Sequence, residues 1–176
     1  WWVVYHAYAN GYHTLGRSTL IEPIEWTSDG WCRTKQDAVW LSENRQPEWK
    51  MELSDDFSKP ELGLQWTFWK EYAPKALTFT EGEMQVKAKG RTPADGRLLL
   101  VTAMDKCYET EVEVRLGNGN IGGLLLYYNE EAYAGVTSDG KNFTVYRGEE
   151  KPLTVANKIG KNFRVKLLNQ GNRLKM

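Results

Sequence analysis

The sequence is short of the residues on which many catalytic and metal sites depend. Its 176 residues include only two histidines and two cysteines, and 23 Lys and Arg are balanced by 23 Asp and Glu, so that the net charge is zero. A zero net charge without a basic stripe argues against nucleic acid as the main partner. No apolar run approaches the roughly 20 residues that a membrane span needs, which argues against a membrane protein.

The scarce cysteines and histidines do not form a recognisable site. Cys32 and Cys107 are too far apart in the sequence for a zinc pattern or a disulfide framework, so we expect two separate, mostly buried thiols. His6 and His13 have no G-x-S-x-G motif beside them and no third ligand at zinc spacing. Hydrogen-bonded structural roles are the simplest prediction for both.

Aromatic side chains are abundant, at 12% of the residues with eight Trp, and the local pattern is that of β-strands. Helical periodicity is nearly absent, whereas apolar and polar residues alternate in short stretches bounded by Gly, Asn, Asp and Pro. Such alternation predicts antiparallel sheets with one dry and one wet face. The clearest dry faces are Val112, Val114 and Leu116, then Phe163, Val165 and Leu167, and then Met84, Val86 and Ala88.

Several strand and turn positions can be predicted more closely. Residues 122–129 are apolar on both faces, as expected of a central strand, and Asp139-Gly140 predicts a tight hairpin. Residues 117–122, GNGNIG, match the G-x-G-x-x-G pattern of dinucleotide-binding folds. An apolar strand follows them, and without a helix N-terminus to hold a phosphate we predict a hairpin loop.

A polar stretch around Pro47 divides the sequence into two parts. We expect residues 1–35 to form a short β segment and residues 36–52 to form a connector anchored by Trp40 and Trp49. Residues 53–176 then hold a run of about eight to ten strands, which is typical of a two-sheet sandwich. Because both ends read as the middle of a strand, we expect the sequence to be cut from a longer protein, with the sandwich truncated at its C-terminus.

Candidate binding residues are aromatic or acidic. Four rings, Trp66, Trp69, Tyr127 and Tyr133, would form a sugar platform if they are exposed together and sandwich core if they are buried. Asp55 and Asp56 could bind calcium through their oxygens if a distant strand adds ligands, and otherwise mark a solvated strand entry. No other cofactor is expected. Glu22 and Glu25 are three residues apart, so on a strand they face opposite sides and do not form a glycosidase acid pair.

Residues 12–31 resemble the closing blade of glycoside hydrolase family 43, whose members are five-bladed β-propeller enzymes that act on xylan and arabinan side chains. The resemblance rests on Leu15-Gly16-Arg17, Leu20-Ile21, Trp26 and Asp29-Gly30-Trp31. From Asp55 onward the sequence resembles the sandwich that follows this propeller in β-xylosidase-like members. The resemblance implies an all-β fold: an antiparallel, concanavalin A-like β-sandwich (jelly roll) preceded by a partial propeller blade.

The resemblance also implies a function and a set of partners. It implies the C-terminal part of a β-xylosidase or arabinofuranosidase, whose sandwich braces the propeller and the pocket rim and whose partners are xylo- or arabino-oligosaccharides and the remaining blades. The two Asp and one Glu that catalyse hydrolysis in the family lie in earlier blades, so we expect no activity from this chain alone. An autonomous carbohydrate-binding module and a purely structural sandwich remain alternatives, and extracellular, periplasmic and intracellular locations stay open.

For two residues of the first segment, the resemblance implies a specific role. Arg17 matches an arginine that faces the sugar in the active pocket of the β-xylosidase branch, where a guanidinium fork suits paired hydroxyls and nearby carboxylates. His6 matches, more loosely, a histidine that some members place near the propeller axis. Both are therefore expected to be substrate-binding residues.

Overall fold

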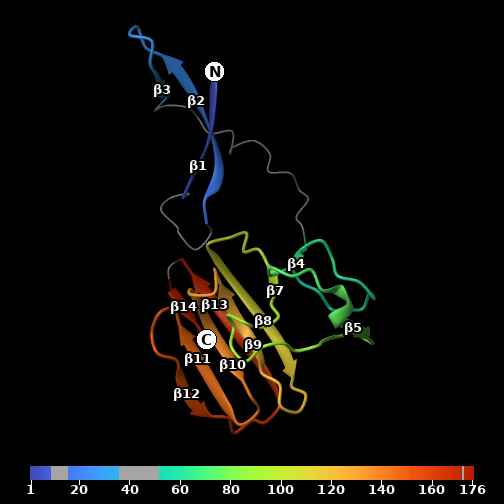
Figure 1. The fold of residues 1–176 in the computed structure, drawn as a ribbon. Coiled ribbons are helices and arrows are strands. Elements are labelled where there is room, and N and C mark those ends of the chain that lie inside the picture. Colours follow the sequence, from blue (N-terminus) through green and yellow to red (C-terminus); the bar gives the residue numbers. More distant parts are fainter. Residues whose placement is uncertain (9–15, 36–51, 172) are drawn as a thin grey trace. The chain divides into compact units, whose positions relative to one another are not determined.

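The structure is a computed structural model that describes residues 1–8, 16–35, 52–171 and 173–176. Within these ranges the regular structure is β-strand apart from one short 3-10 helix, so the predicted all-β class is confirmed (Figure 1). The chain divides into two compact units, residues 1–51 with 103–106 and residues 52–102 with 107–176. Nearly all of the expected connector, with Trp40 and Trp49, lies outside the described residues, as do His13 and Leu15. No described helix is long and apolar enough to cross a membrane.

The first unit contains a three-stranded antiparallel sheet in the order β1-β2-β3. Its strands are β1 (Trp2–Ala7), β2 (Ser18–Trp26) and β3 (Cys32–Thr34). A tight turn joins β2 to β3, in which the Thr27 hydroxyl is bonded to the Asp29 carboxylate and Gly30 has a φ of 86°. That φ lies in the left-handed region, where a residue with a Cβ is strained, and it explains why Gly follows Asp at this turn.

The second unit is built around two facing sheets. The four-stranded sheet has the order β12-β11-β10-β9, and the three-stranded sheet has the order β14-β13-β8. The strands of the first are β9 (Gly122–Tyr127), β10 (Tyr133–Ser138), β11 (Asn142–Arg147) and β12 (Leu153–Ala156). Those of the second are β8 (Cys107–Arg115), β13 (Asn162–Gln170) and β14 (Arg173–Lys175).

The core lies between these two sheets and consists of the side chains that alternation predicted. Leu116, Phe163 and Val165 are buried at its centre, and the Phe163 ring meets that of Phe143 edge-on at 5.3 Å. Leu167 on the same side of β13 is only 2% exposed. Half-buried residues from both sheets pack around the centre: Val112, Val114, Leu124, Val136 and Phe143. The dry faces predicted for β8 and β13 are therefore confirmed.

The opposite face of β8 and β13 is exposed and charged, as predicted. Lys166 pairs with Glu109 at 2.6 Å, and Arg164 pairs with Glu111 at 3.2 Å and also with Glu113. Each of these side chains is at least 40% exposed, so water screens the charges and each pair adds little to the stability of the sheet. The charges keep this outer face in water and fix which side of the sheet faces the core.

Two short ribbons and one helical turn complete the second unit. β4 (Trp66–Phe68) pairs with β7 (Leu99–Val101), and β5 (Leu77–Thr80) pairs with β6 (Glu83–Val86) after the 3-10 helix η4 (Pro74–Ala76). Met84 is half-buried, but Val86 and Ala88 are exposed, so the inward face predicted for 84–88 is wrong beyond Met84. The reason is that β6 ends at Val86 and pairs with β5 alone among the described strands.

Three other predictions need correction. Cys32 and Cys107 are exposed rather than buried, because each is the first residue of its strand and lies at the rim of a sheet. Residues 122–127 form the outermost strand of the four-stranded sheet and not a central one. The loop at 117–121 crosses from β8 in one sheet to β9 in the other, so it is not a hairpin loop, although it does join two strands as expected.

The predicted hairpin at 139–140 is confirmed. Ser138 of β10 stands opposite Phe143 of β11, and the Asp139 amide donates to the Asn142 carbonyl at 3.2 Å. The Asp139 carboxylate accepts the amides of Lys141 and Asn142 at 2.7 and 2.6 Å. These bonds lower the pKa of Asp139 below its ordinary value, because they favour the ionised carboxylate.

Candidate functional site

The residues matched to the sugar pocket lie at one end of the β1–β2 ladder. His6 stands opposite Thr19, and Arg17 immediately precedes β2, two positions before Thr19. Because side chains alternate along a strand, this register is expected to bring Arg17 and His6 to the same face of the sheet. Both side chains are exposed. A guanidinium and an imidazole at this end could together donate several hydrogen bonds to sugar hydroxyls or a carboxylate.

The same face of this sheet carries an apolar patch. Val4 stands directly opposite Ile21, and Trp2 stands opposite Pro23. Trp2, Val4 and Ile21 are 54%, 62% and 51% exposed. Side by side on one sheet face, they form the kind of exposed apolar surface that marks an interaction site in a folded protein. We call Trp2, Val4, Ile21 and Pro23 the blade face.

The carboxylates of β2 do not form a catalytic pair. Glu22 accepts a hydrogen bond from the Tyr5 hydroxyl at 2.5 Å, which together with desolvation raises the pKa of Tyr5. Glu25 is bound instead by Arg33 of β3 at 2.8 Å. The two acids therefore have separate partners, as their three-residue spacing predicted for opposite faces of a strand. Neither is positioned across a shared sugar site.

In the second unit, four aromatic rings form a continuous row. Trp69 meets Tyr127 edge-on at 5.3 Å, Tyr127 stacks on Tyr133 at 5.8 Å with an angle of 11°, and Tyr133 meets Tyr146 at 5.3 Å. The register of β9, β10 and β11 puts the three tyrosines on the sheet face opposite to the core. Gly135 stands opposite Tyr146 with a φ of 150°, where a Cβ would collide with the Leu124 carbonyl at 2.3 Å.

Two neighbouring members of this aromatic row, Trp69 and Tyr127, differ in their polar contacts. The Trp69 indole N–H donates to Glu130 at 3.3 Å, and Lys70 forms an ion pair with the same carboxylate. Lys70 is the main cause of the lowered pKa of Glu130. The Tyr127 hydroxyl, in contrast, is buried without a hydrogen-bond partner among the described residues. Desolvation raises the pKa of both Tyr127 and Tyr133.

The four rings named as a possible sugar platform are therefore only partly brought together. Trp69, Tyr127 and Tyr133 belong to one row, whereas Trp66 lies in another part of the unit. All four are half-buried, and the contacts within the row are edge-on except for the stack of Tyr127 on Tyr133. This geometry matches neither a flat, exposed platform nor a fully buried core.

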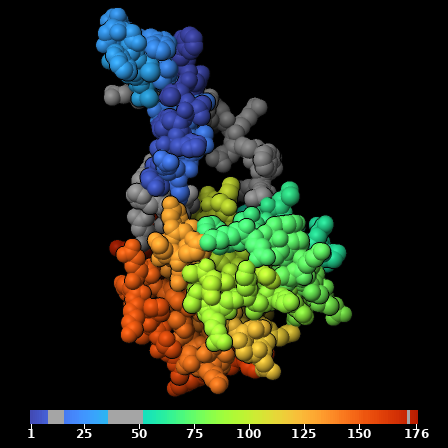
Figure 2. Space-filling view, viewed as in Figure 1, coloured from blue at the N-terminus to red at the C-terminus, as the bar shows by residue number. Residues whose placement is uncertain are grey.

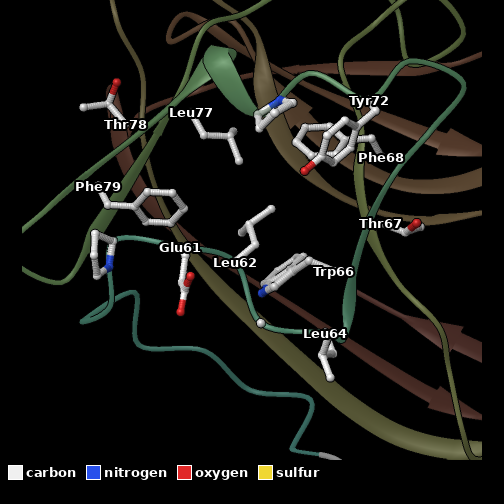
Figure 3. Close-up of a pocket in the computed structure, with 13 residues that line it drawn as sticks. Glu61, Leu62, Leu64, Trp66, Thr67, Phe68, Tyr72, Leu77, Thr78 and Phe79 are labelled. Carbon is white, nitrogen blue, oxygen red and sulfur yellow. The ribbon is translucent and has the colours of Figure 1, made fainter.

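Trp66 lines a separate apolar cleft of about 620 Å³ (Figure 3). The picture shows Phe79 and Leu77 entering the cleft from β5, Trp66 and Phe68 facing them from β4, and Leu62 between the two sides. Tyr72 lies beside Phe68, with the ring centres 5.5 Å apart. A cleft of this size with aromatic walls is suited to a small ligand or an extended segment of chain.

The acidic pair at 55–56 is occupied with local hydrogen bonds. Asp55 accepts the Phe57 amide and the Trp66 indole N–H, both at 2.8 Å, and the Gln65 amide at 3.3 Å. The pKa of Asp56 is lowered chiefly by a hydrogen bond from the Ser58 side chain, and also by the Ser58 amide, which donates to the carboxylate at 2.9 Å. No group of three or more His, Cys, Asp or Glu in the described ranges is arranged to hold a metal ion. Asp55 is thus placed as an anchor for Trp66, and calcium binding at Asp55 and Asp56 stays a prediction.

Several residues of these sites carried no clear signal in the sequence. Tyr146 extends the aromatic row from a strand 13 positions after Tyr133, and Glu130 reaches Trp69 across 61 positions. Tyr72 could have been suspected from its place among the aromatic residues of 66–72. The other two become neighbours of Trp69 and Tyr133 only through strand pairing and the packing of a loop onto the sheet.

Two family models match the chain. Residues 1–32 match glycosyl hydrolases family 43, and residues 54–168 match the beta xylosidase C-terminal concanavalin A-like domain. The second match covers more than half of the chain. A curated relative, the non-reducing end alpha-L-arabinofuranosidase of Bacteroides ovatus, is 35% identical over 99 residues, which are 51% of this chain and 19% of that protein.

Solved structures show the same fold. A family 43 protein of Bacillus licheniformis matches 99% of this chain and 38% of its own with a TM-score of 0.67 and 21% identity. A xylan beta-1,4-xylosidase of Bacillus halodurans matches 99% of this chain and 39% of its own with a TM-score of 0.66 and 20% identity. The chain thus spans well under half of the length of these relatives. The chain belongs to the family of the beta xylosidase C-terminal concanavalin A-like domain, and the residues before this domain match glycosyl hydrolases family 43.

Proposed function

We propose that this chain is the C-terminal part of a glycosidase that acts on xylan- or arabinan-type glycosides. In this proposal residues 1–35 complete a propeller, residues 36–52 connect, and the sandwich of residues 53–176 braces the propeller and forms part of the pocket rim. The order of the two family matches within one chain carries the proposal. The names of the arabinofuranosidase and xylosidase relatives support the choice of substrate class.

The exposed apolar side chains of the blade face give a physical reason to propose a partner that covers them. A three-stranded sheet cannot bury both of its faces by itself, and here Trp2, Val4 and Ile21 are all more than half exposed. Neighbouring blades of a propeller would cover such a face. Because each of these side chains is already about half covered, burying the rest would add roughly 1–1.5 kcal/mol per side chain. The remaining blades of the same enzyme are therefore the proposed partner of this face.

Arg17 and His6 are the proposed contributions of this chain to the sugar pocket. Arg17 is exposed and forms no ion pair within the described residues. Its guanidinium is free to bind paired sugar hydroxyls or to lower the pKa of a carboxylate supplied by earlier blades. Because the family's catalytic carboxylates lie in those blades, the chain alone is expected to be inactive.

A chimeric enzyme tests this proposal. Residues 1–176 would replace the matching region of the Bacteroides ovatus arabinofuranosidase, and hydrolysis of an aryl arabinofuranoside would be measured. We expect an active chimera, an inactive isolated chain, and a loss of about 10- to 100-fold in kcat/KM for Arg17→Ala, the effect of removing one charged hydrogen-bond donor. Arg33→Ala is the matched control, because Arg33 is exposed in the same sheet but binds Glu25.

Two results would contradict the proposal. Hydrolysis by the isolated chain would mean that the reacting acids lie within these 176 residues. Equal kcat/KM values for the Arg17→Ala and Arg33→Ala chimeras would remove Arg17 from the pocket, even if the sandwich still supports the fold of the enzyme.

A further inference from the structure

A second cleft in the sandwich unit is lined by a cluster of basic side chains. Four cations, Lys75, Lys87, Lys89 and Arg97, and one carboxylate, Glu71, line this space of about 590 Å³. Figure 2 shows the two segments that supply most of them, around residues 75 and 90, next to each other on the visible face. Charges of one sign thus gather in one cleft of a chain whose net charge is zero.

Backbone contacts hold these cations close to one another. The Lys87 amide donates to the Ala76 carbonyl at 2.8 Å, which joins the strand end after β6 to η4. The Arg97 guanidinium donates to the Lys87 carbonyl at 2.9 Å. Three short segments between residues 75 and 97 therefore present their basic side chains to the same space.

The charge in the cleft is only partly balanced. Lys89 binds Glu71 at 2.8 Å and is the main cause of the lowered pKa of Glu71, to which Arg97 also contributes. Within the described part of the chain, Lys75 and Lys87 form no ion pair, and both are exposed. Two ammonium groups and the remaining donors of Arg97 are left to bind an anion.

The basic cleft borders the apolar cleft of Figure 3. Tyr72 and Pro74 line both spaces. Tyr72 is 82% exposed and is braced edge-on by Phe68. A ligand that lies across Tyr72 would meet aromatic faces on one side and ammonium groups on the other.

We propose that the basic cleft, together with the exposed Tyr72 ring at its border, binds an oligosaccharide that carries uronic acid groups. The C–H face of a sugar ring packs well on an exposed tyrosine, and a uronate carboxylate suits neighbouring Lys and Arg side chains. Inorganic anions would use the lysines but not the rings, and neutral sugars would use the rings but not the lysines. The choice of a saccharide rests on the proposed function, whereas the need for a negative charge rests on the cleft alone.

Isothermal titration of the chain is the direct test. The probes are xylotriose carrying one glucuronic acid group, the same xylotriose without it, sodium phosphate, and an oligoglutamate peptide. We expect the acidic sugar to bind at least tenfold more tightly than each of the others. We also expect its binding to weaken as the salt concentration rises, because the charges involved are exposed.

Matched variants locate the binding. Lys75→Gln combined with Lys87→Gln should weaken binding by about two- to fivefold for each lysine, the effect of losing an exposed ion pair. The control is Lys151→Gln combined with Lys158→Gln, which removes two exposed lysines elsewhere in the sandwich unit and should leave binding unchanged. Tyr72→Ala should weaken the acidic sugar but leave any binding of phosphate unchanged. Far-UV circular dichroism checks that every variant is folded.

The other outcomes would overturn the inference. Equal binding of the neutral and acidic sugars, or equal effects of the two double variants, would show that the lysines of the cleft do not select the ligand. Tighter binding of phosphate or of oligoglutamate would identify a different anion as the ligand. Because binding is measured on the chain without any hydrolysis, failure here leaves the chimera test of the proposed function unaffected.

Discussion

The replacement of Asp55 by Ala separates a structural role from a metal-binding role at the start of the sandwich. Asp55 accepts three N–H groups, from Phe57, Gln65 and Trp66, whereas the neighbouring Asp56 accepts the amide of Ser58. Phe57 has a φ of 53°, which is strained for a residue with a side chain. The hydrogen bond from its backbone N–H to the Asp55 carboxylate helps to hold it in this conformation. Asp55→Ala removes all of these acceptors at once.

The expected cost follows from the number of bonds and their exposure. Each hydrogen bond of this kind is worth about 1 kcal/mol when the groups are partly exposed, so Asp55→Ala should destabilise the sandwich by about 2–3 kcal/mol. Asp56→Ala loses only hydrogen bonds from Ser58 at the exposed surface, so it should cost clearly less than Asp55→Ala. Urea unfolding followed by Trp fluorescence gives both values, and Trp66 itself reports on the site.

The same unfolding experiment, repeated with calcium and with a chelator, decides between the two roles. We expect the wild-type unfolding midpoint to be the same with calcium and with the chelator, because the Asp55 carboxylate already accepts three N–H hydrogen bonds. A midpoint that rises with calcium, and that loses this rise in both Asp55→Ala and Asp56→Ala, would refute the structural role and establish a metal site. Equal losses of unfolding free energy for Asp55→Ala and Asp56→Ala without calcium would refute the argument that Asp55 contributes more hydrogen bonds than Asp56.

Three further outcomes are expected. Phe163→Ala should destabilise the sandwich by about 3–5 kcal/mol in urea unfolding, because it leaves a cavity in the core next to Phe143. Lys166→Ala, on the outer face of the same strand, should cost much less because its ion pair is exposed, and similar costs would contradict the assignment of the core. Tyr127→Phe should leave stability unchanged or raise it by up to about 1 kcal/mol, because the hydroxyl it removes is buried without a partner among the described residues; a marked loss in thermal unfolding would show that the hydroxyl is hydrogen-bonded. Asp139 has a pKa lowered below its ordinary value of 3.8, so its contribution to stability is complete above that pH and is lost as the pH falls through the folded-state pKa. Asp139→Asn should therefore reduce the loss of stability measured between pH 5 and pH 2. An unchanged loss would show that the Asp139 carboxylate does not contribute to the acid dependence of stability.

The alternation of apolar and polar side chains was enough to determine the main sheets of the sandwich. Val112, Val114, Phe163 and Val165 could be assigned to the core because a strand has a period of two, and one face of an antiparallel sheet must be dry. The hairpin at 139–140 was equally predictable, since Asp-Gly strongly favours a two-residue turn. The family was visible from the sequence too, in the segment around Arg17 and in the order of the two parts.

Strand neighbours and exposure were decided only by the tertiary structure. Alternation shows which way a side chain points but not which strand lies beside it, so the apolar segment 122–127 could not be recognised as an outer strand, nor Cys32 and Cys107 as exposed rim residues. For the same reason the aromatic row and the basic cleft had no linear signal. The members of the aromatic row come from segments far apart in sequence, and packing alone brings Glu130 to Trp69. The members of the basic cleft lie within residues 71–97, but the sequence does not show that the chain folds back to bring Lys75 and Lys87 to the same space.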